Sequence, residues 1–150
     1  MRLSSGGLDV GLPPGFEVRV KAQPPSGLDG SRNLLLHAAT VPLPAERGDF
    51  GSGVWELLGP DDVFVSLLEY DAEDAGTVLF EAQGLPVVRP GDFSPAAMQR
   101  QLAGRSGAQW FFTVSGRPFC LYAVLGSHAR RAAGAATVSR LLRSMHVEAR

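Results

Sequence analysis

The last third of the chain constrains the fold most strongly, because two apolar runs joined by a tight turn lead directly into an amphipathic segment. The runs lie within residues 108–126 and are interrupted only by Ser115-Gly116 and Arg117-Pro118, which predicts a β-hairpin. Both runs are almost continuously apolar, so we expect both faces of the hairpin to be covered by other parts of the protein. Residues 128–145 follow at once and predict a helix that can cover one face.

This C-terminal helix is expected to have an apolar stripe and a basic face. Ser127 precedes it and can accept a hydrogen bond from a free N–H group of its first turn. Small side chains in the first half would allow a close approach to the sheet, and larger ones at the end would fill a wider gap. The predicted stripe consists of Ala129, Ala132, Ala133, Ala136, Leu141, Leu142 and Met145, with Arg130, Arg131, Arg140 and Arg143 outside it.

Upstream patterns predict further strands. The clearest are at residues 16–20, 33–41 and 63–70, the last after the turn Gly59-Pro60-Asp61-Asp62. Residues 23–30 are rich in Pro, Ser and Gly and predict a loop. Weaker patterns indicate a short strand at 77–81, strand or coil at 54–58 and an edge at 85–89, and we expect residues 1–12 to lack a fixed structure.

Phe93-Ser94-Pro95 is the strongest signal for the start of a helix. Ser94 can cap the helix, Pro95 suits its first position, and Phe93 can pack on Met98. The pattern predicts a helix over residues 95–103, which Gly104 would end.

Together these elements predict one α+β domain over residues 1–150, an antiparallel β-sheet of about five to six strands packed with two helices, including the long C-terminal helix. The length of 150 residues and the 45% share of hydrophobic residues suit a single core.

Composition argues against several classes of partner. The net charge is −1, from 14 basic and 15 acidic residues, so no global field attracts nucleic acid or an anionic membrane, and we expect neither as a partner. Cys120 is the single cysteine, which excludes an internal disulfide and favours a reducing compartment. No apolar run approaches the roughly 18 residues of a membrane span. The chain is therefore expected to be cytoplasmic.

The sequence carries no catalytic or cofactor motif that we can identify. Cys120 lies in an apolar run, where a cysteine usually behaves as a small buried hydrophobe, so we interpret it as structural rather than as a nucleophile. The three histidines lack the spacing of metal ligands, and the carboxylates of residues 61–62 and 69–74 are typical of turns and solvated loops. We expect no cofactor and no metal site.

Aromatic and basic residues indicate an interaction surface. Trp110, Phe111 and Phe112 are consecutive, so their side chains alternate between the two faces of a strand, and one of those faces would serve a partner protein or a second copy of the chain. The candidate interaction residues are Trp55, Trp110, Phe112, Arg130 and Arg131.

The opening Leu12-Pro13-Pro14-Gly15-Phe16, the final hairpin and the closing helix that ends at residues 141–147 (LLRSMHV) together resemble the α/β sandwich of the PsbP-like proteins, a group that includes a Ran-binding nuclear import factor. The resemblance implies an antiparallel sheet between helices and a role in binding other macromolecules, without catalytic residues. The segment at residues 49–71 is also similar to an uncharacterised bacterial domain.

Two functions follow from these patterns. The leading hypothesis is a non-enzymatic binding or accessory protein that engages another protein through its sheet or loop surface, as a monomer or a homodimer. The alternative is a small enzyme or ligand-binding domain with a pocket near residues 44–58, to which Asp49, Phe50 and Glu69 would contribute. The enzyme requires converging ionisable groups, whereas the binding protein requires an exposed apolar surface.

Overall fold

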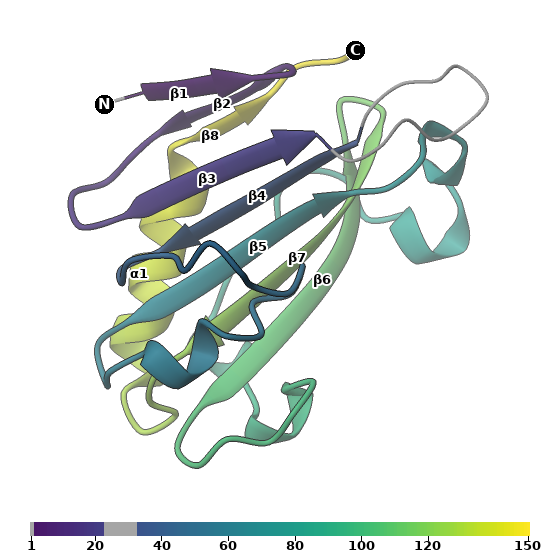
Figure 1. The fold of residues 1–150 in the computed structure, drawn as a ribbon. Coiled ribbons are helices and arrows are strands. Elements are labelled where there is room, and N and C mark those ends of the chain that lie inside the picture. Colours follow the sequence, from purple (N-terminus) through teal and green to yellow (C-terminus); the bar gives the residue numbers. More distant parts are fainter. Residues whose placement is uncertain (1, 23–32) are drawn as a thin grey trace.

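Two antiparallel sheets form the framework of the computed structural model, which describes residues 2–22 and 33–150 (Figure 1). The small sheet has the order β1 (Arg2–Ser5), β2 (Leu8–Gly11), β8 (Met145–Val147). The main sheet has the order β3 (Glu17–Ala22), β4 (Leu34–Ala39), β5 (Val63–Glu69), β7 (Arg117–Leu125), β6 (Ser106–Val114). Helix α1 (Arg131–Arg143) connects β7 to β8, and short 3-10 turns occupy Trp55–Leu57, Ala72–Asp74, Val78–Phe80, Pro90–Asp92 and Pro95–Ala97.

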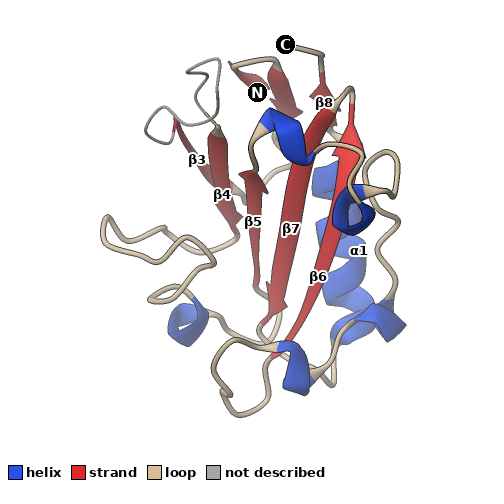
Figure 2. Cartoon of the chain, turned by 90° about the vertical axis from the view of Figure 1, so that its right-hand side faces the viewer, coloured by secondary structure: helices blue, strands red, loops and turns tan. Residues whose placement is uncertain are grey.

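The main sheet is covered on both faces. Helix α1 lies against one face, and the loop between β4 and β5 lies on the other (Figures 1 and 2). Alternation along β5 divides its side chains accordingly: Val65 belongs to the core beneath α1, whereas Phe64 packs with Trp55 and Tyr122 under the loop. All nine residues of β7 are buried. This confirms the predicted hairpin, and it confirms the coverage of both faces for β7, whereas in β6 Gln109 is exposed and Trp110 and Phe111 are half-buried.

Helix α1 is confirmed, with a shorter span and a rotated face. The Ser127 hydroxyl accepts a hydrogen bond from the Arg130 N–H group at 3.3 Å, and the helix ends at Arg143, after which Met145 begins β8. A Cβ atom at Gly134 would lie 2.8 Å from Leu125 Cδ2, so the glycine allows a close approach to β7. This contact directs Ala135, Val138, Leu141 and Leu142 inward and leaves Ala129, Ala132, Ala133 and Ala136, which we expected on the buried stripe, exposed.

The prediction of a second helix at residues 95–103 was wrong. The Ser94 hydroxyl does accept a hydrogen bond from the Ala96 N–H group at 3.1 Å, but the turn ends at Ala97 and Met98 is extended. The Tyr122 hydroxyl accepts the hydrogen bond of the Gln99 N–H group at 3.1 Å. A tertiary partner thus replaces the helical one, and the fold has one long helix instead of two within the described residues.

Other boundaries also differ from the prediction. The expected single sheet of five to six strands is a sheet of five strands and a separate sheet of three. Residues 2–11, which we expected to lack a fixed structure, form β1 and β2 because β8 returns to pair with β2. Residues 77–81 and 54–58 form 3-10 turns, and residues 85–89 form no strand. The loop predicted at residues 23–30 lies outside the described residues.

Arg117 forms a buried ion pair within the main sheet and also connects that sheet to the small one. Arg117 donates to both carboxylate oxygens of Glu69, at 2.8 and 3.1 Å, and both side chains are almost completely buried. Another Arg117 nitrogen donates to the backbone oxygens of Gly6, in the β1–β2 turn, and Glu148, which follows β8, at 2.9 and 3.0 Å. Arg150 donates to Glu69 at 2.7 Å. A single guanidinium therefore ties the end of the small sheet to the main one.

Candidate functional site

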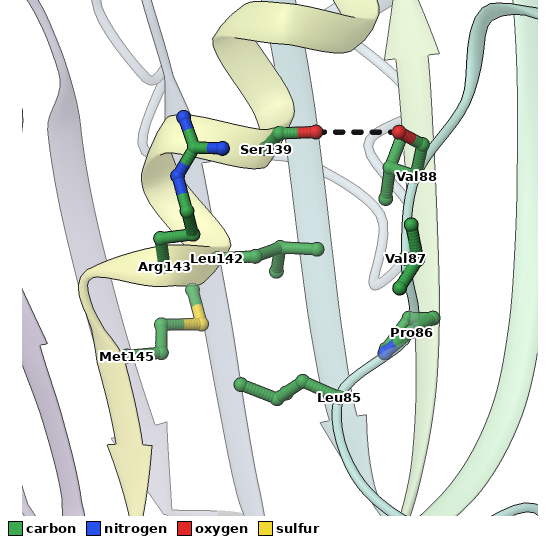
Figure 3. A pocket seen from close by; sticks show the side chains of 8 residues that line it. All are labelled: Leu85, Pro86, Val87, Val88, Ser139, Leu142, Arg143 and Met145. Carbon is green, nitrogen blue, oxygen red and sulfur yellow. Dashed lines mark hydrogen bonds between the residues drawn. The ribbon is translucent and has the colours of Figure 1, made fainter.

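A groove between α1 and residues 85–88 is the best candidate for a binding site (Figure 3). Its volume is about 430 Å³, within the usual range for ligand sites. Leu142 from α1 and Leu85 from the opposite segment point into the space between them (Figure 3). The lining consists of Leu85, Pro86, Val87, Val88, Ser139, Leu142, Arg143 and Met145.

The local sequence explains why residues 85–88 lie beside the helix (Figure 3). Pro86 has no N–H group and therefore disfavours a central strand. The segment is held by side-chain packing instead of by strand pairing. Val88 is buried in the core beneath α1, whereas Val87 is 68% exposed. The Ser139 hydroxyl donates to the Val88 carbonyl at 3.3 Å, which holds the segment against the helix.

The charge at the groove comes from Arg143. The lining contains no aspartate, glutamate, histidine or cysteine, and none of the ion pairs within the described residues involves Arg143. Arg140, one turn earlier, donates to the Thr137 hydroxyl at 3.4 Å and likewise has no carboxylate partner in that part of the chain. An apolar floor beside guanidinium groups that have no carboxylate partner among the described residues suits a ligand that is both apolar and acidic.

The residues predicted as an interaction surface do not lie together. Trp55 and Phe112 are buried on opposite faces of the main sheet. Trp110 is half-buried and packs edge-on against Phe93, with ring centroids 6.1 Å apart. Arg130 and Arg131 are exposed at the start of α1, where Arg130 pairs with the exposed Asp61.

Of the three residues predicted to share a pocket, Asp49 and Phe50 are adjacent in the sequence, whereas Glu69 belongs to a separate cluster of hydrogen bonds. Asp49 uses its backbone carbonyl, which accepts from the Ser66 hydroxyl at 2.6 Å. Phe50 packs edge-on against Tyr122, with centroids 5.8 Å apart. Glu69 is buried in the ion pair described above, where burial would raise its pKa but the hydrogen bonds from Arg117 and Arg150 lower it below its usual value. These groups do not form a shared acid–base site.

Cys120 is free and completely buried in β7, in agreement with the structural interpretation. Burial raises the pKa of its thiol, and its hydrogen-bond partner is the Gln109 amide, 3.2 Å from the sulfur. In the part of the chain that the structure describes, no group of three or more histidine, cysteine or acidic residues could hold a metal ion, and no helix is long and apolar enough to span a membrane.

No protein-family model matches the chain, and searches of curated proteins and of solved structures found no significant match.

His37 fixes the β4–β5 loop in a way that depends on its protonation. Its Nε2 atom lies 2.7 Å from the Asp49 carbonyl, and its Nδ1 atom lies 2.7 Å from Arg47 Nε. Since the guanidinium can only donate, Nδ1 accepts and Nε2–H donates, so the ring is neutral. Burial is the main cause of the lowered pKa of His37, and the Arg47 charge lowers it further, against the opposing effect of the Asp49 hydrogen bond.

We expect the stability of the protein to fall as the pH drops through about 6.5, the usual pKa of histidine. Below that pH, His37 binds a proton more readily in the unfolded chain than in the folded protein. The contribution of neutral His37 to the free energy of unfolding is therefore complete above that pH, and it is lost as the pH falls towards the lower pKa of the folded state. Urea unfolding at several pH values measures the effect, and His37→Gln should reduce the slope. An equal slope in both proteins would contradict the assignment.

Proposed function

We propose that this protein is a non-enzymatic binding domain whose groove holds a segment of another protein, one that presents an apolar side chain flanked by a carboxylate. The juxtaposition of the exposed Val87 with an Arg143 that has no carboxylate partner among the described residues carries the proposal. Exposed apolar side chains beside an apolar cavity are typical of protein interfaces, and arginine is enriched in them.

The composition of the groove favours binding over catalysis. Ser139 supplies the one hydroxyl of the lining, and it is engaged with the Val88 carbonyl. A general base would need to reach a substrate proton, and no histidine or carboxylate lines this groove to do so. The alternative, a small enzyme with a carboxylate pocket near residues 44–58, gains no support from the separate positions of Asp49 and Glu69.

The resemblance to the PsbP-like proteins is consistent with this proposed function, because it also implies binding of macromolecules. The sheet between helices that the resemblance implies differs from the described structure, in which α1 covers one face of the main sheet and the β4–β5 loop covers the other. We also propose a cytoplasmic location, which the unpaired Cys120 favours.

Peptides selected from a random display library against the protein are expected to combine apolar and acidic residues and to bind in the groove. Val87→Asp and Arg143→Glu should each weaken binding of these peptides by about tenfold or more, because they remove an apolar contact and reverse the attractive charge. Isothermal titration calorimetry measures the loss.

The matched controls are Val78→Asp and Arg131→Glu. Val78 is 84% exposed and Arg131 is also exposed, yet neither lines the groove, so affinity should be retained. Selected peptides without acidic residues, or equal losses in the groove variants and their controls, would contradict the proposal.

A further inference from the structure

The free edge of β6 contains a gap in its hydrogen bonding. Gly107 exchanges two backbone hydrogen bonds with Ser94, both 3.0 Å. Towards the other end of the strand, the Thr113 N–H group donates to the Ala82 carbonyl and the Thr113 carbonyl accepts from the Gly84 N–H group, both at 2.8 Å. Gly107 and Thr113 therefore direct their backbone groups away from β7. Figure 2 shows that β6 lies at the edge of the main sheet.

Outward-facing residues alternate along a strand, so Gln109 and Phe111 also present their N–H and C=O groups to this edge. Among residues 2–22 and 33–150, no hydrogen bond outside the β6–β7 ladder uses these four groups. The gap spans residues 108–112, about 17 Å of extended chain.

The intervening chain leaves the edge unpaired for a physical reason. After Gly84 the chain departs from β6, and it returns at Ser94. Between these points, Pro86 and Pro90 lack the N–H groups that a strand needs, and Val88 is packed beneath α1. The chain thus supplies strand partners at both ends of the gap and none at its centre.

The exposed edge also lacks the usual protection against pairing. Natural edge strands carry charges, prolines or bulges, whereas β6 reads SGAQWFFTV and pairs with β7 in an unbroken register. Gln109 is exposed, and Trp110 and Phe111 are half-buried. The side chains and the backbone here are both suited to receiving a strand.

We propose that β6 binds an extended segment of another polypeptide, of about five residues, by strand addition between Gly107 and Thr113. The backbone of the segment would pair with Gln109 and Phe111. Its side chains would alternate between the face that carries Trp110 and the opposite face that carries Phe111, which favours β-branched and aromatic residues. This site goes beyond the groove and does not depend on it.

A second copy of the chain does not fit this edge. A two-fold antiparallel pair of β6 strands that matches Gln109 with Phe111 would place Thr113 of one copy opposite Gly107 of the other. That position is already occupied by Ser94. A short separate segment avoids this conflict.

Amide hydrogen exchange and peptide selection together test the proposal. In the free protein, the amides of Gln109 and Phe111 should exchange at least tenfold faster than that of Trp110, whose N–H group faces β7. Peptides of about seven residues, selected from a random display library, should include a class that slows exchange at Gln109 and Phe111. Slow exchange at both amides before any peptide is added would overturn the proposal.

Gln109→Pro removes an outward N–H group without removing a bond to β7, and proline is tolerated at such positions of edge strands. It should weaken binding of these peptides at least tenfold, whereas the matched variant Gln109→Ala, which keeps the N–H group, should not. Thermal unfolding checks that both variants fold. If Gln109→Pro does not fold, backbone N-methylation of the peptide at alternate residues provides the same test. Peptides that all depend on Val87 and Arg143 but not on the Gln109 N–H group would overturn strand addition while supporting the groove.

Discussion

Arg117→Met is expected to destabilise the protein by about 3–5 kcal/mol, the usual cost of breaking a buried ion pair. The substitution leaves the Glu69 carboxylate buried with its main counter-charge removed, and it also deprives the Gly6 and Glu148 carbonyls of their donor. Urea unfolding monitored by circular dichroism measures the loss. The exposed pair Arg130–Asp61 provides the control, because Arg130→Met should cost at most about 1 kcal/mol.

The same pair should produce a second, acid-dependent signature. The pKa of Glu69 is lower in the folded protein than its usual value, near 4.5. Ionised Glu69 therefore contributes fully to the free energy of unfolding above the usual pKa, and this contribution is lost as the pH falls through the lower pKa of the folded state. Arg117→Met should weaken this dependence. A small loss of stability at neutral pH with an unchanged acid response would show that the pair contributes little to folding.

Gly126→Ala is expected to cost about 3 kcal/mol or more through steric overlap. An added Cβ atom would lie 1.8 Å from the Gly59 carbonyl oxygen and 3.2 Å from the Asp62 carbonyl oxygen, and both belong to backbone that cannot rotate away. The Gly126 N–H group also donates to Asp62 at 2.9 Å, so displacement of the turn would break that bond as well. Thermal unfolding of the purified variant measures the effect.

Gly91→Ala is the matched control, because a Cβ atom at Gly91 would meet no atom within 4 Å and its backbone is not in the left-handed region. Its melting temperature should stay close to that of the unmodified protein. Similar melting temperatures for the two variants would mean that the turn at residues 59–62 can move to accept the methyl group.

Local sequence patterns predicted the structure correctly where residues close together in the sequence determine it. The turn at Ser115-Gly116 has positive φ angles at both residues, which Gly accepts readily and which tight hairpin turns require, and the predicted hairpin formed around it. The predicted helix at residues 95–103 failed because its continuation depended on Tyr122, which is distant in sequence and accepts the Gln99 N–H group instead.

The candidate sites could be predicted only in part, because they depend on contacts between distant residues. The groove joins residues 85–88 to α1, about fifty positions later, and the proline-interrupted run at residues 85–89 indicated only an edge. The sequence predicted Glu69 as a carboxylate of a pocket, but Arg117, 48 positions away, pairs with that carboxylate in the fold. The apolar runs around the Ser115-Gly116 turn predicted β6, but the gap along its free edge depends on where Ser94 and Ala82 pair with it.

The pairing of β2 with β8 has a consequence for the order of folding. Leu8 and Val147 are register partners, so the small sheet closes a loop that contains almost the whole chain, and such closure is slow unless the intervening segments have already folded. We therefore expect the main sheet and α1 to assemble before β8 pairs with β2, so that the small sheet forms last.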